Sequence, residues 1–370
     1  GMAESGPPRA DGMAGEGSAG VATVALRVPE RMVAQPGAAA EPVPAPRGGS
    51  VARGDHPPQE APLELASGPP RPLAKREEPQ LLPGTRGSQF SSLVPLKPGT
   101  GTPLFLVHSV GGNVLCYAEL SRCLESGPVF GLQSIGFAAG SEPHKTIEEM
   151  AAFYVDTIRT VTPHGPYRLG GWSMGGLIAY EAAQLLAADG EPVELLALLD
   201  TMAPVPLSPD MGKPDEAYLL AGMALDLGQQ TGRDLGVTAP RLRWMRPEKR
   251  LQYVLDRARA TGALPAEMGA GAIRLWRVFL ANASAGQVYR PASYHGRVLF
   301  LAASRNATRE HLGPALGWER FALGGLDLDT YDTGHWDLLR YPTVRAVAER
   351  LDRASRAASV PTFSGELSRP

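Results

Sequence analysis

The sequence predicts an α/β protein with a mostly parallel central sheet, flanking helices and a helical insertion. From Leu93 onward, short apolar runs alternate with amphipathic stretches, as strands and crossover helices do in a parallel sheet. The largely apolar run from Val193 to Leu199 is typical of a strand that is covered on both faces. Residues 204–290 break this alternation with helical patterns and no strong strand, which favours an insertion.

The first half of the domain supplies two strands before its best-marked helix. Apolar runs at 104–107 and 129–132 predict buried strands, and a helix is expected between them over 114–124. Thr146 and Glu149 have the spacing of a capping box, so a helix should begin directly after Thr146.

The second half repeats the pattern around the insertion. A helix from Gly175 has almost no polar face, so it should lie in the middle of the domain. The remaining expected elements are insertion helices over 217–227, 247–260 and 272–285, strands over 298–302 and 326–331, and a closing helix over 343–354. The sheet is therefore expected to continue after the insertion.

The first 90 residues differ in composition from the rest. They contain 15 Pro and 13 Gly and no aromatic residue before Phe90, which is typical of disordered segments. Gly1 before Met2 is typical of a cloning remnant, so Met2 is either a native start or an arbitrary boundary. We expect a disordered leader or interdomain linker over 1–90, the α/β domain over 91–358 with its lid insertion over 204–290, and a flexible tail over 359–370.

Composition and charge argue against several classes of protein. No apolar run of about 18 residues and no signal peptide is present, so the sequence predicts a cytoplasmic protein without a membrane span. The formal net charge of -2 argues against nucleic-acid binding through bulk electrostatics. Cys116 and Cys123 are too far apart along one predicted helix for a disulfide, so both are expected to be packing residues.

Ser173 is the candidate nucleophile. It lies in Gly171-Trp172-Ser173-Met174-Gly175, a GxSxG pattern between an expected strand over 167–169 and the apolar helix. This context is that of a nucleophile elbow, a sharp turn that presents the serine hydroxyl at the mouth of an α/β-hydrolase sheet. Small residues on both sides of the serine permit the close approach of strand and helix that the turn requires.

The serine needs a base, which α/β-hydrolases supply as a histidine late in the chain. His295, His311 and His335 follow Ser173. His335 closely follows the last expected strand, whereas His295 precedes a strand and His311 lies in a charged loop further from its strand. We therefore expect His335 to be the base.

The base needs an acid that fixes its tautomer and stabilises its charged form. Asp200 directly ends the strand after the elbow helix, at the edge of the sheet where α/β proteins place their sites. The next strand is followed by no carboxylate until Glu310, which favours Asp200 further. Asp332 and Asp337 lie close to His335 in the sequence and remain alternatives.

A tetrahedral oxyanion needs two preorganised backbone donors. The N–H of Met174, directly after the serine, is the first candidate. The second is the N–H of Val110, because it lies after the first core strand in His108-Ser109-Val110-Gly111-Gly112, where glycines permit an inward N–H.

These residues lie in segments that resemble the thioesterase domains of nonribosomal peptide synthetases and polyketide synthase assembly lines. The resemblance runs from about Leu93 to Arg353 and is carried by LFLVHSVGGNVLCYAEL, VFGLQSIG, IEEMAAFYVDTIRTVTPHGPYRLGGWSMGGLIAYEAA, LLALLDT, VYRPASYHGRVLFLAA and YDTGHWDLLRYPTV. It implies a triad of Ser173, Asp200 and His335, with Val110 as the early-loop donor.

The resemblance also implies a reaction. An acyl or peptidyl chain, held as a thioester on the phosphopantetheine of a carrier protein, would pass to Ser173 and leave by hydrolysis or macrocyclisation. The carrier domain is the implied partner, and the domain itself is expected to bind no cofactor and no metal. Ser109 stands where the family usually has proline and Thr333 where it often has glycine, and neither change removes a catalytic group.

The insertion holds two further sets of candidates. Basic residues outnumber acidic ones between Arg241 and Arg259, so this stretch is a candidate docking surface for an acidic carrier domain, with a solvated helix face as the commoner explanation. The candidate docking residues are Arg243, Arg246, Lys249 and Arg250. Trp244, Trp276 and Phe279 are candidates for lining an acyl channel, with packing as the alternative.

Other functions remain open at this point. A free-standing editing thioesterase or a carboxylesterase would use the same three residues on a different substrate. A noncatalytic binding domain would keep the hydrolase fold without the reaction. The complete triad and the glycine loop favour an enzyme.

Overall fold

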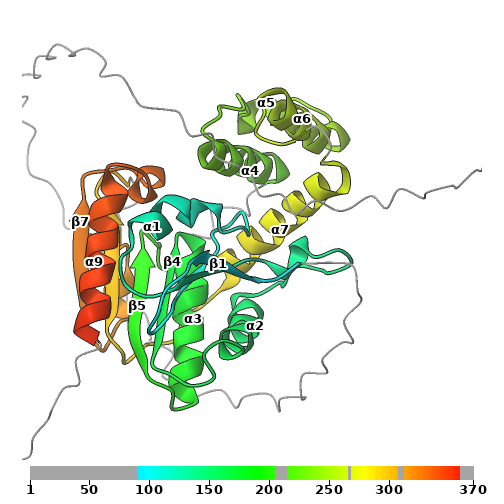
Figure 1. Cartoon of the computed structure of the whole chain (residues 1–370). Coiled ribbons are helices and arrows are strands. Elements are labelled where there is room, and N and C mark those ends of the chain that lie inside the picture. Colours follow the sequence, from blue (N-terminus) through cyan, green and yellow to red (C-terminus); the bar gives the residue numbers. More distant parts are fainter. Residues whose placement is uncertain (1–89, 205–214, 266–267, 307–311, 359–370) are drawn as a thin grey trace, which may run out of the picture. The chain divides into compact units, whose positions relative to one another are not determined.

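The computed structural model describes residues 90–204, 215–265, 268–306 and 312–358 (Figure 1). The expected leader over 1–90, apart from Phe90, and the expected tail over 359–370 lie outside the described residues. His311 lies outside them as well.

The described strands form one sheet in the order β1-β3-β2-β4-β5-β6-β7. The strands are β1 (Leu93–Lys97), β2 (Leu104–Val107), β3 (Val129–Leu132), β4 (Tyr167–Trp172), β5 (Val193–Leu199), β6 (Val298–Ala303) and β7 (Leu326–Tyr331). Strand β1 pairs antiparallel with β3, and the other pairings are parallel, so the predicted mostly parallel sheet is confirmed. Strand β1 was not predicted, because its half-exposed residues include Pro95 and give no strong strand pattern.

The register of the sheet aligns the ends of its central strands. Trp172 on β4 pairs with Leu199 on β5, and Leu199 pairs with Leu301 on β6. Ser173 and Asp200 each follow one of these paired residues, so they leave the sheet side by side. The carboxyl ends of parallel strands are where open α/β sheets hold their sites.

Helices cover both faces of the sheet. On one face, α2 (Ile147–Arg159) and α3 (Met174–Ala188) pack with alternate strand residues. On the other face lie η1 (Leu115–Tyr117), α1 (Ala118–Cys123), η4 (Trp336–Leu339) and α9 (Thr343–Ala358). Leu198 belongs to the first apolar cluster and Leu199 to the second, as expected of a strand that is buried on both faces.

The start of α2 agrees in part with the predicted capping box. Thr146 Oγ1 accepts the N–H of Glu149 at 3.1 Å, so α2 begins where the capping box predicted. The Glu149 carboxylate accepts the N–H of Lys145 at 2.8 Å, one residue earlier than the box requires.

Cys116 and Cys123 are free thiols that pack against the second apolar cluster.

Four helices lie in the described part of the region between β5 and β6. They are α4 (Glu216–Thr231), α5 (Ala239–Arg243), α6 (Pro247–Ala260) and α7 (Gly269–Val288). They share an apolar cluster of their own, and α7 also packs against α2 and η2 (Ile135–Phe137). Helix α5 was not predicted, because five residues are too few to show a helical period. No helix in the described ranges has the length and apolar character needed to span a bilayer.

Asp352 on α9 joins the last helix to the first half of the sheet. Its buried carboxylate accepts the N–H groups of Glu125 at 2.9 Å and Ser126 at 3.0 Å, and also the Ser126 hydroxyl. These donors lie directly before β3. The closing helix is therefore held by polar contacts as well as by its apolar face.

Replacing Asp352 should test this attachment. Asp352→Ala leaves two backbone N–H groups without their acceptor, so the free energy of unfolding should fall by about 2–4 kcal/mol in chemical denaturation. Glu349→Ala, on the exposed face of the same helix, should change it by less than about 0.5 kcal/mol. Equal effects of the two changes would contradict the role given to Asp352.

Candidate active site

Ser173 lies in a strained turn between β4 and α3. Its φ of 56° and ψ of -127° place a non-glycine residue in a region that L-residues rarely occupy, as a nucleophile elbow requires. The N–H of Ser173 donates to the Leu199 carbonyl at 2.9 Å, which fixes the turn on β5. A Cβ at Gly171 would overlap the backbone of Gly175, and one at Gly175 would overlap the Val107 carbonyl. Glycine is therefore required at both positions.

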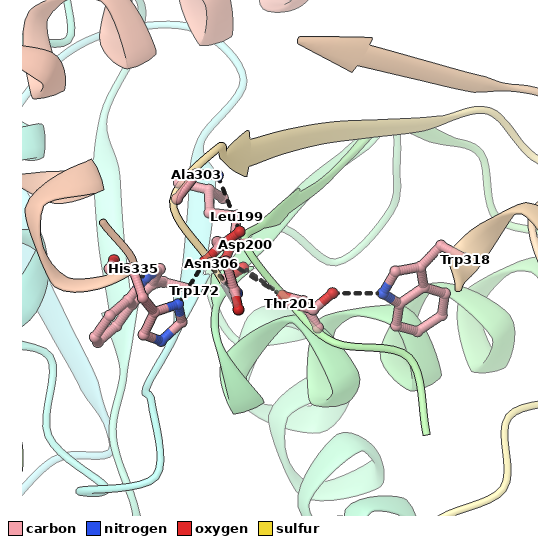
Figure 2. Close-up of polar contacts among 9 residues, drawn as sticks. Trp172, Leu199, Asp200, Thr201, Ala303, Asn306, Trp318 and His335 are labelled. Carbon is pink, nitrogen blue, oxygen red and sulfur yellow. Dashed lines mark hydrogen bonds and ion pairs between the residues drawn. The ribbon is translucent and has the colours of Figure 1, made fainter. Parts of the chain in front are cut away.

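Asp200 is buried, with 1% of its surface exposed, and three residues lie within hydrogen-bond distance of its carboxylate (Figure 2). Its Oδ1 accepts the N–H of Ala303 at 2.9 Å. Its Oδ2 accepts the side-chain amide of Asn306 at 3.0 Å and lies 2.6 Å from Nδ1 of His335. Sequence reasoning did not identify Asn306, because an amide after a strand has many possible roles.

The ring of His335 is oriented by aromatic neighbours as well as by Asp200. It stacks on Trp172 at 4.6 Å and 25° between planes, and meets Trp336 edge-on at 5.5 Å. The indole N–H of Trp172 donates to the His335 carbonyl at 3.2 Å. A neutral ring that donates its Nδ1 proton to Asp200 keeps Nε2 as its acceptor. Trp172 is the residue before Ser173, so the histidine ring lies beside the elbow.

The alternative acids, Asp332 and Asp337, and the alternative base, His295, are engaged elsewhere or exposed. Asp332 is exposed and accepts from Arg305 at 3.0 Å, and this guanidinium lowers the pKa of the carboxyl. Asp337 is exposed at the start of η4. His295 is exposed and lies before β6, at the opposite end of the sheet from Asp200. The geometry thus joins His335 to Asp200.

Val110 lies in a tight turn that an insertion helix holds in place. The N–H of Gly112 donates to the Ser109 carbonyl at 2.9 Å, and Gly112 has a φ of 81°. The Val110 carbonyl accepts the side-chain amide of Asn282, buried on α7, at 2.9 Å. Asn282 therefore restrains a turn in which Ser109 lacks the fixed φ of proline. Sequence reasoning did not identify Asn282, because one asparagine inside a helical pattern gives no signal.

The aromatic candidates of the insertion separate into two groups. Trp276 and Phe279 are buried in the insertion cluster with ring centroids 6.4 Å apart, and Phe279 also lines a cavity beside Gly111. The expectation for Trp244 is corrected, because its side chain is 93% exposed and lines no described cavity. Its place at the end of the short helix α5 turns it toward solvent.

Two of the four basic candidates contact the insertion itself. Arg250 is half-buried and donates to the Leu242 carbonyl at 2.9 Å and to Glu216 at 3.2 Å, so the expectation that it docks a partner is corrected. Arg243 pairs with Asp215 at 2.7 Å. The side chains of Arg246 and Lys249 are exposed and form no hydrogen bond within the described ranges.

Asp226 on α4 is a buried acid that sequence reasoning did not identify. Only 4% of it is exposed, and its Oδ2 accepts the amide of Gln230 at 2.7 Å. A Cβ at Gly111 would overlap this Oδ2, so the carboxyl lies against the turn that carries Val110. Burial raises the pKa of Asp226 from 3.8 to about 7.

Comparison with known sequences identifies relatives of this chain. Residues 102–354 match a family described as Thioesterase domain. The dimodular nonribosomal peptide synthase of Bacillus subtilis (strain 168) is 32% identical over 266 residues, 69% of this chain and 10% of that protein. Polyketide synthase PksR of the same organism is 36% identical over 130 residues, 35% of this chain and 5% of that protein. The chain thus spans a small part of the length of these relatives.

Solved structures show the same fold. A four-domain nonribosomal peptide synthetase bound to AMP and glycine is 33% identical with a TM-score of 0.67, over 73% of this chain and 20% of that one. The NocB thioesterase domain, in a covalent complex with a fluorophosphonate nocardicin G analog, is 28% identical with a TM-score of 0.51, over 71% of this chain and 99% of that one.

The burial of Asp226 should make stability depend on pH. The folded state keeps this carboxyl protonated up to pH about 7, whereas the unfolded chain releases the proton near pH 3.8. The folded state therefore binds more protons between these values, and its stability contribution falls as the pH rises through them. Above pH 7 the burial of the charge destabilises the fold by on the order of 4 kcal/mol.

Asp226→Asn should remove this dependence. We expect the variant to match the wild type in free energy of unfolding near pH 4 and to exceed it at pH 8, as measured by chemical denaturation. His108, whose buried ring has a pKa lowered to about 4, acts in the opposite direction but is present in both proteins and cancels in the difference. Asp256→Asn, at an exposed acid on α6, is the control and should show a pH-independent difference. The same flat difference for Asp226→Asn would contradict the burial of its charge.

Proposed function

Because the chain belongs to the thioesterase domain family of nonribosomal peptide and polyketide synthases, we propose that it releases an acyl or peptidyl chain through an ester on Ser173. Membership of this family supports a hydrolase. The observation that carries the proposed roles is the 2.6 Å contact between Asp200 and His335 beside a strained Ser173. A weak nucleophile, its base and the acceptor that orients the base are the groups that acyl transfer to serine requires.

In the first half-reaction, Nε2 of His335 takes the proton of the Ser173 hydroxyl as Oγ attacks the thioester carbonyl carbon. Asp200, whose carboxylate receives the Nδ1 proton as a hydrogen bond, stabilises the imidazolium that forms. The N–H groups of Val110 and Met174 bind the negative oxygen of the tetrahedral intermediate. As the intermediate collapses, the carbon–sulfur bond breaks, and His335 returns its proton to the departing thiolate.

In the second half-reaction, an acceptor hydroxyl or amine attacks the ester carbonyl. His335 takes the proton of the acceptor and then gives it to Ser173 Oγ as the ester bond breaks. Water as the acceptor gives a free acid, and a hydroxyl or amine of the same chain gives a macrocycle. The triad serves both acceptors equally, so exclusion of water by the insertion decides between them.

The thioester is proposed to arrive on the phosphopantetheine arm of a carrier-protein domain, and the thioesterase domain holds no cofactor of its own. The relatives support this proposal, since they are synthases much longer than the part that matches this chain. The exposed pair Arg246 and Lys249 is the proposed contact with an acidic carrier surface. Arg243 and Arg250 are occupied by Asp215 and Glu216 and are left out of that contact.

Labelling with a serine-directed fluorophosphonate tests the triad. Ser173→Ala should not label, because the attacking oxygen is gone. Asp200→Asn should lower the rate of thioester turnover by about 10⁴, since the amide favours the wrong tautomer of His335. Asp332→Asn is the matched control and should keep the wild-type rate. Labelling of Ser173→Ala equal to the wild type, or a loss at Asp332 as large as at Asp200, would refute these roles.

Charge reversal tests the carrier contact. Arg246→Glu with Lys249→Glu should lower kcat/KM for a carrier-bound thioester about tenfold at low salt and little at high salt, because exposed charges act mainly on association. Turnover of a small free thioester should not change. Arg353→Glu with Arg356→Glu, exposed on α9, makes the same change in net charge and should leave carrier kinetics as they are. If the two double variants behave alike, the insertion does not dock the carrier.

A further inference from the structure

A small cavity lies between the insertion helices and the turn that carries Val110. Its volume is about 30 Å³, more than the roughly 10–15 Å³ of cavity that one water molecule needs. Gly111 and Asn113 line it from the turn, Asp226 and Gln230 from α4, and Phe279 from α7. The cavity therefore has room for a small polar group, such as an ammonium group or a water molecule.

Asp226 is the acidic side chain among those that line this cavity. Its Oδ2 accepts from Gln230 at 2.7 Å, whereas its buried Oδ1 has no partner in the part of the chain that the structure describes. The other lining side chains of the insertion are mostly apolar. A carboxylate oxygen in such surroundings interacts strongly with any donor that reaches it, because little water competes.

The charge of Asp226 is not neutralised within the described ranges. No ion pair of Asp226 is formed there, and the nearby Cys116 thiol stays neutral because burial and the Asp226 charge raise its pKa. An apolar side chain of similar size would avoid the destabilisation described above. A polar group that lowers stability and has no structural partner is typical of a binding site, where its contribution to function retains it in the sequence.

We propose that Asp226 determines substrate specificity by binding a primary ammonium group on the acyl chain. The proposal rests on the thioesterase function proposed above and names the substrate class of that site. An ammonium group is small enough for the cavity and brings three donors and a positive charge to Oδ1. Charge-assisted hydrogen bonds of this kind are about twice as strong as neutral ones.

The position of Asp226 also limits where this amine lies on the substrate. The carboxyl lies against Gly111, which directly follows Val110, and consecutive Cα atoms are about 3.8 Å apart. The thioester oxygen is proposed to bind the N–H of Val110. The amine is therefore expected on the first few carbons of the acyl chain, and not at the far end of a long one.

Matched thioesters of N-acetylcysteamine test the proposal. The first pair is 3-aminobutanoyl and 3-methylbutanoyl, in which an ammonium replaces a methyl group of nearly equal size, and 3-hydroxybutanoyl tests a neutral donor. The wild type should favour the amine over the methyl compound at least about tenfold in kcat/KM at pH 8. Asp226→Asn, which keeps the size of the side chain and an acceptor for Gln230, should lose this preference and still hydrolyse the methyl compound.

Control variants and a second readout separate the outcomes. Asp256→Asn should keep the wild-type preference. Equal kcat/KM for all three thioesters, a preference for the hydroxyl compound, or a preference retained in Asp226→Asn would overturn the subsite and leave the cavity as the place of a structural water only.

If no thioester is hydrolysed, the labelling rates of two alkyl fluorophosphonates, one with an amino group and one with a methyl group, take the place of turnover. Faster labelling by the amino probe in the wild type alone supports the subsite, and equal rates overturn it. Failure of both probes to label Ser173 would overturn the proposed function, and the subsite with it.

Discussion

The buried carboxylate of Asp200 is the interaction on which the rest of the site depends. A charge that is almost without solvent contact is tolerated only if hydrogen bonds replace its water, and Asp200 receives them from Ala303, Asn306 and His335. Ala303 ends β6, Asn306 follows β6 and His335 follows β7, whereas Asp200 itself directly follows β5. One side chain thus joins the ends of three strands and orients the histidine. Its own backbone has a φ of 44°, a second strained residue beside Ser173.

The insertion helices also contact the turn at Val110 and the segment after His335. Asn282 on α7 holds the Val110 carbonyl, and the carboxyl of Asp226 on α4 fills the space beside Gly111. Arg340, at the end of η4, donates to the Gln229 carbonyl on α4. The insertion helices are therefore attached to the turn at Val110 and to the end of η4 after His335. A change in the packing of these helices is expected to move the turn that carries Val110, the proposed oxyanion donor.

Sequence reasoning succeeded where the signal is local. The strands at 104–107, 129–132 and 193–199 and the start of α2 follow from apolar runs and a capping threonine, and the structure confirms them. It failed for Trp244 and Arg250, because an aromatic or basic residue in a helical pattern does not say which neighbours it meets. Asn306, Asn282 and Asp226 gave no signal for a similar reason. Each of them contacts a residue more than a hundred positions away, which is Asp200 for Asn306, Val110 for Asn282 and Gly111 for Asp226.

The sequence by itself determined the order of the elements, the sharp turn at Ser173 and a short set of candidates for acid and base, because apolar periodicity and glycine spacing act over a few residues. The tertiary structure decided between Asp200 and its rivals, since only the register of β4, β5 and β6 brings the ends of these strands together. It also decided which polar side chains of the insertion face the turn at Val110. Contacts between distant segments depend on packing in three dimensions, for which a single sequence carries no local pattern.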